Sequence, residues 1–314
     1  MSIIMKYIVT GGAGFIGSHI VEAMAGKHEV VVIDNFLSGK WENLSEFSDS
    51  VQVIRGSITD LSLLKNVFKE ADGIFHLAAI ASVARSVDDP VATHETNLTG
   101  TLNVLLAARD CGVKKVVFSS SSAVYGDEPT LPKREDLPPF PLSPYAVSKL
   151  ASEYYCRVFS ELFGVKTVSL RYFNVFGPRQ DPLGEYAAVI PKFITNLLND
   201  KPPLIFGDGK QTRDFVYVKD VVQANIRAMQ SSATGIFNIG SGKSTDLNTL
   251  ANSIAEIMKV SRLPVYEKPR SGDIRDSVSD ITAAHKAFGY HAGYSLDEGL
   301  LETIQWFSKK NGNS

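Results

Sequence analysis

Cysteine, clustered histidine and long apolar runs are all scarce in this sequence of 314 residues. Its two cysteines, Cys111 and Cys156, stand far apart and outside any CxxC spacing, which predicts reduced thiols in a cytoplasmic protein. The six histidines form no HExxH or similar ligand spacing, so we expect no metal site. No apolar run reaches ~18 residues, so we expect no membrane span, and the N-terminal stretch MSIIMKYIVTGG is interpreted as a buried strand rather than a signal peptide.

An excess of charge of one sign is also missing. The chain carries 32 basic and 34 acidic side chains, for a formal net charge of −2. This balance gives no support to a nucleic-acid partner held by a broad basic surface, although a small anionic ligand needs only local arginines. The length and a hydrophobic content of 44% predict a large core and two subdomains.

The first half alternates short β-branched runs with longer amphipathic runs. This alternation predicts an α/β fold of the Rossmann type, with a doubly wound parallel sheet between helices. We expect strands that are buried on both faces at Tyr7–Val9, Val30–Ile33, Val51–Ile54, Ile74–Leu77, Lys115–Phe118 and Thr167–Arg171. We expect helices near Phe15–Ala25, Leu61–Lys69, Pro90–Cys111 and Ser143–Phe163.

The segment Gly126–Pro144 contains six prolines and is predicted to be an extended loop. It ends in Ser143-Pro144, a typical helix start with a serine cap and proline at the first helical position. Beyond Asn174 the elements become shorter. We therefore predict a Rossmann-type domain over 1–174, which a segment near 214–240 rejoins, and a smaller α/β domain over 175–314.

The stretch TGGAGFIGSH follows the first strand directly, and Gly11, Gly14 and Gly17 give a GxxGxxG spacing. Glycines at such a turn let the backbone approach a pyrophosphate, and the following helix offers its N-terminal amides to the phosphates. Asp34 ends the second strand, where a carboxylate accepts hydrogen bonds from ribose hydroxyls and repels a 2′-phosphate. The pattern predicts NAD rather than NADP.

Tyr145 and Lys149 are four residues apart at the start of the predicted helix, so they share one helix face. The preceding strand ends in a serine cluster, Ser119 to Ser122, at the sheet edge where ligands bind. A lysine cation and a nearby nicotinamide would favour the phenolate and lower the pKa of Tyr145. We therefore interpret the pair as part of a proton-transfer site rather than an ordinary surface pair.

Three motifs together resemble the extended short-chain dehydrogenase/reductase family: Gly11–Gly17, FSSSSAVYG (Phe118–Gly126) and the YxxxK of Tyr145–Lys149. The resemblance covers essentially the whole chain. RYFNVFGPRQDP (Arg171–Pro182), EYAAVIPKF (Glu185–Phe193), GDGKQTRDFVYVKD (Gly207–Asp220) and RSGDIRDS (Arg270–Ser277) narrow it to the NAD-dependent UDP-hexose 4-epimerases, most similar to those acting on UDP-N-acetylglucosamine.

The resemblance implies a role for each residue of the predicted catalytic set. Tyr145 would take the proton from the sugar 4-hydroxyl, Lys149 would hold the nicotinamide ribose, and Ser121 would hydrogen-bond the 4-oxygen. Hydride would pass from C4 to NAD and return to the other face of a 4-keto sugar. The cofactor residues implied are Gly11, Gly14, Phe15, Ile16, Gly17, Asp34, Asn35, Ser57, Ile58, Leu77, Ala78, Ala79, Ser119, Tyr145, Lys149 and Phe173.

The substrate residues implied are Ser121, Ser122, Asn174, Val189, Phe206, Arg213, Arg270, Asp273 and Ser277. The two arginines match pyrophosphate ligands, for which a guanidinium is well suited. Ser277 matches the position beside the sugar C2 substituent, where a small residue leaves room for an N-acetyl group. The sequence departs from the family at Ser57, where an Asp often contacts adenine, and at Ala81, where relatives often carry Gly or Lys.

Several alternatives stay open at this point. A 4,6-dehydratase is disfavoured because Ser122 and Ala123 occupy the positions of its acid pair. A uronate 4-epimerase or decarboxylase of the same family has no clear excluding signature, and a non-catalytic NAD-binding sensor would not need the proton relay. The helix predicted over 143–163 has more apolar surface than a single buried face requires, which predicts a homodimer formed through this helix together with the one over 90–111.

Overall fold

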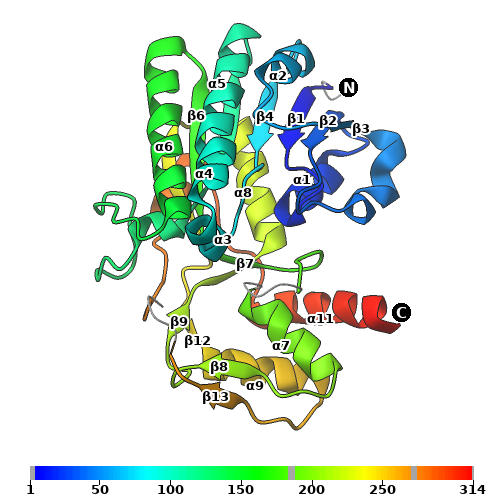
Figure 1. Cartoon of the computed structure of the whole chain (residues 1–314), viewed down its shortest axis with the longest axis vertical. Coiled ribbons are helices and arrows are strands. Elements are labelled where there is room, and N and C mark those ends of the chain that lie inside the picture. The colour runs from blue at the N-terminus through cyan, green and yellow to red at the C-terminus, as the bar shows by residue number, and fades with distance from the viewer. Residues whose placement is uncertain (1–3, 183–187, 270–273, 313–314) are drawn as a thin grey trace.

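The computed structural model describes residues 4–182, 188–269 and 274–312. Its centre is a sheet of seven parallel strands in the order β11-β6-β5-β4-β1-β2-β3 (Figure 1). The strands are β1 Lys6–Thr10, β2 Glu29–Asp34, β3 Gln52–Arg55, β4 Gly73–His76, β5 Lys115–Ser121, β6 Lys166–Tyr172 and β11 Gly235–Ile239. The predicted Rossmann-type class is thereby confirmed.

The strand order reverses between β1 and β4. From β1 the chain winds through β2 to β3 on one side, and from β4 through β5 to β6 on the other. Thr10, the last residue of β1, pairs with Ile33 of β2 and with His76 of β4. In open parallel sheets of this kind, ligands bind beyond the carboxyl ends of the strands at the point of reversal. The topology therefore places the expected site next to the end of β1.

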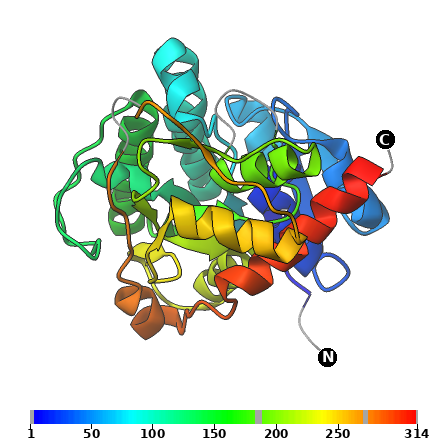
Figure 2. The same ribbon diagram turned by 90° about the horizontal axis from the view of Figure 1, so that it is seen from below.

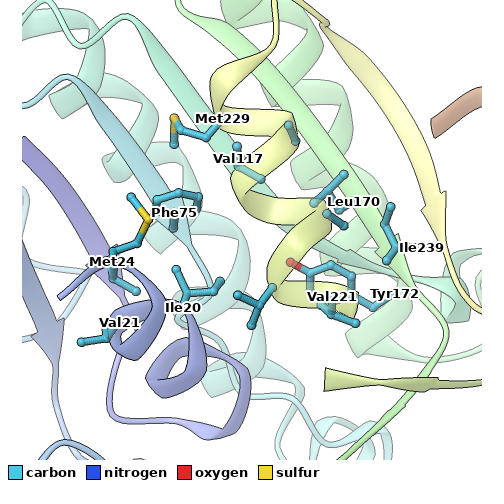
Figure 3. Packing of buried hydrophobic residues seen from close by; sticks show 14 of the residues in the cluster. Ile20, Val21, Met24, Phe75, Val117, Leu170, Tyr172, Val221, Met229 and Ile239 are labelled. Atoms are coloured by element: carbon cyan, nitrogen blue, oxygen red, sulfur yellow. The ribbon is translucent and has the colours of Figure 1, made fainter. Parts of the chain in front are cut away.

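Successive strand residues pack into two separate cores, because neighbouring side chains of a strand point to opposite faces. Val9 and Phe75 pack with α1 (Phe15–Met24) and α8 (Val218–Gln230), as Figure 3 shows around Ile20, Val21, Val221 and Met229. Ile8 and Ile74 pack on the other face. The helices there are α2 Leu61–Val67, α3 Val83–Asp88, α4 Pro90–His94, α5 Gly100–Asp110 and α6 Pro144–Phe163.

The predicted helix over 90–111 exists but is not regular throughout. A π-helical turn, Glu95–Thr99, joins α4 to α5 and carries the buried Asn97. The Asn97 side chain donates to the Ser148 hydroxyl of α6 and exchanges two hydrogen bonds with the backbone of Ile80. The wider turn thus provides a polar link between this helix and the helix that carries Tyr145.

The smaller part of the molecule lies below the carboxyl edge of the sheet in Figure 1, and Figure 2 shows it from beneath. Its core is formed by α7, α9 and α11 around residues such as Phe193, Ile254 and Leu300. Its elements are β7 Asn174–Phe176, α7 Val189–Leu198, β8 Leu204–Phe206, β9 Thr212–Arg213, β10 Phe215–Tyr217, β12 Thr245–Asp246, α9 Leu247–Met258, β13 Val265–Glu267 and α11 Leu296–Gly312. Helix α10, Thr282–Phe288, instead packs on β11 of the central sheet.

One detail differs from the sequence predictions. Strand β3 is not buried on both faces, because it forms the sheet edge and its four residues are half-buried or exposed. Helix α8 packs on the sheet and β11 pairs with β6, and both lie in the segment near 214–240 that is expected to rejoin the first domain. The division into two domains stays a prediction.

Candidate functional site

The glycine turn after β1 brings the chain unusually close to itself. Gly11 has φ +70°, and a Cβ there would lie 2.7 Å from the backbone nitrogen of Ala78. A Cβ on Gly17 would lie 2.1 Å from the carbonyl oxygen of Gly11. Helix α1 begins at Phe15, immediately after Gly14, and its first backbone N–H groups have no partner within the helix. The turn therefore forms a cradle of backbone amides that suits a phosphate group.

Asp34 is fixed at the end of β2. Its side chain is 7% exposed, and its carboxylate accepts one hydrogen bond from the backbone N–H of Ala13 (2.9 Å) and one from that of Phe36 (2.8 Å). Burial raises the pKa of this carboxyl, and the two N–H donors oppose that effect. A carboxylate offers about four acceptor positions, so lone pairs remain for ligand hydroxyls.

A cavity of about 480 Å³ opens beside these groups, at the carboxyl ends of β1, β2, β4 and β5. All the residues predicted to bind the cofactor line it, from Gly11 to Phe173. A second cavity of about 1030 Å³ lies next to the first, and Ala81, Asn174, Val175 and Gln180 line both. The two cavities thus share one wall.

Helix α6 carries Tyr145 in its first turn. The Ser143 hydroxyl accepts a hydrogen bond from the backbone N–H of Ala146 (3.2 Å), and Pro144 occupies the first turn, as the sequence predicts. The Ser86 hydroxyl accepts a further bond from the backbone N–H of Tyr145 (3.1 Å). These contacts fix the start of the helix and leave the tyrosine phenol at the cavity.

The predicted catalytic residues meet at the cavity beside the end of β5. The Lys149 ammonium donates to the carbonyl oxygen of Ser119 (2.7 Å) and lies 5.8 Å from the centroid of the Tyr145 ring. The hydroxyls of Tyr145 and Ser121 are hydrogen-bonded, and the Ser121 oxygen also accepts from the backbone N–H of Ala123. All three side chains line the smaller cavity.

Burial governs the charge states of Tyr145 and Lys149. Burial raises the pKa of the Tyr145 phenol, and the hydrogen bond with Ser121 opposes this without reversing it. Burial also lowers the pKa of Lys149 to about 8, against the raising effects of Cys156 and Glu153. The protein alone therefore does not lower the pKa of Tyr145, because loss of hydration outweighs the hydrogen bond with Ser121. The expected lowering, which includes the charge of a bound nicotinamide, stays a prediction.

The predicted substrate residues fall into four groups. Ser121 lines the smaller cavity. Asn174, Val189, Phe206 and Arg213 line the larger cavity. Ser122, in a short 3₁₀ turn, and the half-buried Ser277 line neither cavity. Arg270 and Asp273 lie outside the described residues. The structure therefore brings one part of the predicted substrate set together around the larger cavity.

The loop after β7 also contributes to the site, which the sequence analysis did not predict, although Arg179, Gln180 and Asp181 belong to the motif RYFNVFGPRQDP. Arg179 adopts φ +67° and pairs with Glu22 of α1 (2.8 Å). Asp181 pairs with Lys40 of the loop after β2 (3.2 Å). Together with Gln180, these side chains line the smaller cavity, so the loop closes one of its sides. Positive φ at a non-glycine residue is a structural signal that the sequence does not show.

Two other kinds of site find no support in the geometry. In the ranges 4–182, 188–269 and 274–312, no group of three or more His, Cys, Asp or Glu side chains is placed to hold a metal ion. No helix among these residues is long and apolar enough to cross a membrane.

An amide cradle, an anchored carboxylate and a Ser–Tyr–Lys set around one cavity define an enzyme that works with a bound dinucleotide. Residues 7–240 match the NAD dependent epimerase/dehydratase family. The chain belongs to this family, which confirms the predicted family and NAD as cofactor. The glycine turn fits NAD because only glycine allows the close approach of Gly11 to Ala78 and of Gly17 to Gly11 that shapes the amide cradle.

The relatives share nearly the full length of the chain. It is 42% identical over 314 residues to a UDP-glucose 4-epimerase of Mycolicibacterium smegmatis, covering 98% of this chain and 100% of that protein. It is 34% identical over 318 residues to a UDP-glucuronate 4-epimerase of Thermodesulfobacterium geofontis, covering 97% of this chain and 96% of that protein.

Two solved structures are also similar. One is a UDP-N-acetylglucosamine 4-epimerase from Methanobrevibacter ruminantium in complex with UDP-N-acetylmuramic acid, with a TM-score of 0.95 and 42% identity over 98% of this chain and 100% of that one. The other is the UDP-glucose 4-epimerase of Thermus thermophilus in complex with NAD, with a TM-score of 0.89 and 40% identity over 97% and 99%.

Proposed function

We propose that this protein is an NAD-dependent UDP-sugar 4-epimerase. The observation that carries the proposal is the position of Ser121, Tyr145 and Lys149 in the cofactor cavity, beside the wall that this cavity shares with the larger one. A sugar that reaches across this wall from the larger cavity would present its 4-hydroxyl to the tyrosine.

Each catalytic side chain has one role in the proposed reaction. Tyr145 takes the proton from the sugar 4-hydroxyl and returns it after the sugar has turned over. The Ser121 hydroxyl hydrogen-bonds the sugar 4-oxygen and helps to carry the proton to the Tyr145 phenol, with which it already forms a hydrogen bond. Lys149 supplies positive charge that favours the phenolate. The glycine turn, Asp34 and Lys149 would hold NAD, which would supply a reversible hydride acceptor for C4 of the sugar.

The larger cavity is the proposed site of the UDP moiety. Phe206 and Val189 line it with apolar side chains that suit a planar base, and Arg213 provides a guanidinium for the pyrophosphate. Arg270 and Asp273 are proposed to complete the grip on the nucleotide. Because UDP supplies most of the binding, the sugar can turn over within the pocket.

The preferred sugar is proposed to be N-acetylated, with some activity on the glucose pair. The similarity to a UDP-N-acetylglucosamine 4-epimerase supports this proposal. Ser277 lines neither described cavity, but it is the position that the resemblance places beside the sugar C2 substituent. Ser277→Tyr should lower kcat/KM for the N-acetylated pair far more than for the glucose pair. Equal losses on both pairs would show that Ser277 does not set the width of the pocket.

The direct experiment uses the wild-type protein with three substrates. UDP-glucose, UDP-N-acetylglucosamine and UDP-glucuronate are incubated separately, and NMR follows inversion at C4. We expect inversion of the first two. Inversion of UDP-glucuronate alone, or loss of its carboxylate as CO₂, would instead identify the uronate epimerase or decarboxylase that the sequence left open. Binding of NAD without turnover of any UDP-sugar would indicate a sensor.

We also propose that the protein forms a homodimer through the segments 90–111 and 143–163. Helix α6 exposes an apolar face, with Val147 51%, Tyr154 52% and Leu162 71% exposed, and Val91 of α4 is 64% exposed. Large exposed apolar patches on a soluble domain mark interaction surfaces. Sedimentation should show a dimer that Leu162→Glu weakens, and a monomeric wild-type protein would contradict the proposal.

A further inference from the structure

The helix face that carries Tyr145 and Lys149 continues with a third polar residue, Glu153. Residues four apart lie on one side of an α-helix, so the three side chains form one stripe along α6. Glu153 is 1% exposed, lines neither cavity and has no part in the reaction described above. A fully buried carboxylate is unusual, so its partners are informative.

Glu153 ties α6 to the two strands beneath it. Its Oε1 accepts hydrogen bonds from the Ser120 hydroxyl of β5 (2.5 Å) and from Nε of Arg171 in β6 (2.9 Å), and its Oε2 accepts from Nη2 of Arg171 (2.8 Å). Ser120 and Arg171 are direct neighbours in the register of β5 and β6. One carboxylate thus connects three elements at a single point.

That point lies next to the catalytic groups. Ser120 stands between Ser119, whose carbonyl accepts the Lys149 hydrogen bond, and Ser121, whose hydroxyl bonds with Tyr145. A shift of Ser120 against α6 would therefore change both contacts at once. Buried ion pairs are weak contributors to stability compared with apolar packing, so stability alone explains the pair poorly.

The groups around Lys149 also give Glu153 an electrostatic role. Burial and the Lys149 charge lower the pKa of His76 on β4 to about 3, while burial raises the pKa of Cys156 on α6 to about 12 and raises that of Tyr145. These three groups are therefore uncharged near neutral pH. The charged groups that remain are Glu153 and, behind it on β6, Arg171.

We propose that Glu153, held by Ser120 and Arg171, is a positioning residue that fixes the Tyr145–Lys149 face of α6 against the end of β5 and supplies the negative charge that keeps Lys149 protonated. The expected effect of Glu153 on turnover rests on the proposed epimerase function. Its expected effect on the charge of Lys149 is a property of the protein alone and does not depend on that function.

The electrostatic part is tested by NMR titration of Lys149 without NAD or substrate. The ¹³Cε signals of labelled lysines are followed against pH, and the signal lost in Lys149→Arg identifies Lys149. Its wild-type pKa should lie near 8, far below the ordinary lysine value. Glu153→Gln should lower the Lys149 pKa by about one to two pH units, because the negative charge of Glu153, which raises that pKa, is removed. Arg171→Met should raise the Lys149 pKa, because the positive charge that offsets Glu153 is then removed.

Opposite shifts in these two variants distinguish the proposal from general damage to the packing. An unchanged pKa in Glu153→Gln, or an equal fall in both variants, would overturn it. Glu161→Gln is the matched control, because Glu161 pairs with Arg157 on the exposed side of the same helix and should leave the Lys149 titration unchanged.

The positioning part is tested by kinetics with Ser120→Ala, which removes one hydrogen bond to Glu153 and no charge. We expect kcat to fall about tenfold or more, because small misplacements of reacting groups are costly, while NAD content and KM stay at wild-type values. A wild-type kcat would overturn this part. If the wild-type protein turns over no UDP-sugar, the proposed function fails, and the NMR titration still decides the role of Glu153.

A double variant covers the risk that a single change leaves a buried charge unpaired and the chain unfolded. Glu153→Met with Arg171→Met replaces the pair by apolar side chains, a change that proteins usually tolerate. It should fold and bind NAD but show a reduced kcat and, with the carboxylate gone, a Lys149 pKa below that of the wild type. Wild-type values for both would show that the pair is merely structural.

Discussion

Removal of the Tyr145 hydroxyl is the sharpest test of the proposed chemistry. In Tyr145→Phe the ring remains, and the contacts that start α6 involve the Ser143 side chain and backbone groups, so the helix should form as before. The change deletes one hydrogen bond, with Ser121, which is worth about 1 kcal/mol of stability. We therefore expect normal folding and normal NAD content.

Turnover should respond far more strongly than stability. A positioned acid or base contributes about 10²- to 10⁴-fold in rate, and Ser121 alone has no basic group to replace the phenolate. We expect kcat of Tyr145→Phe to fall at least ~10²-fold in the NMR assay of C4 inversion. Tyr155→Phe is a matched control, because Tyr155 lies on the same helix with 37% of its surface exposed. A Tyr145→Phe enzyme within tenfold of wild type would refute the assignment of the base.

Three further changes test the cofactor site and the core. Asp34→Ser should weaken NAD binding and narrow the difference from NADP, and wild-type protein that binds both equally by calorimetry would contradict the role of the carboxylate. Gly17→Ala should abolish NAD binding, because its Cβ would meet the Gly11 carbonyl oxygen at 2.1 Å; retention of NAD after gel filtration would show that the turn can open. Burial lowers the pKa of His76 to about 3 and that of His19 to about 4. The unfolded chain therefore binds more protons below the ordinary pKa of about 6.5, and the free energy of unfolding should fall by about 1.4 kcal/mol per pH unit for each group as the pH drops toward its folded pKa. In His76→Gln the free energy of unfolding, measured with urea, should fall less steeply between pH 6 and 5, by the contribution of one proton. An unchanged pH dependence would show that His76 is already charged in the folded protein.

The sequence predicts those parts of the fold that depend on local patterns. The central strands were found because Val30–Ile33 and Ile74–Phe75 are apolar on both faces, and the start of α6 because Ser143-Pro144 is a local capping signal. Strand β3 was misjudged because an edge position depends on strand order, which its four residues do not encode.

Those residues of the site that belong to local sequence motifs could be predicted, and those placed by distant contacts could not. The cofactor residues lie in short motifs next to strand ends, so they could be named individually, and they line one cavity. The part played by Arg179 and Asp181 depends on contacts with α1 and with the loop after β2, more than a hundred residues away. Burial, which raises the pKa of Tyr145 in the protein alone, depends on the whole surrounding structure and is not encoded in the YxxxK motif.

The wall shared by the two cavities makes the two ligands thermodynamically coupled. Asn174, Val175 and Gln180 contribute to both cavities, so whatever orders this wall for one ligand also orders it for the other. Linkage is reciprocal: if bound NAD increases the affinity for the nucleotide sugar by some factor, the bound sugar must increase the affinity for NAD by the same factor. A substrate affinity measured on protein that has lost NAD therefore does not describe the substrate site of the NAD-bound enzyme that catalyses the reaction.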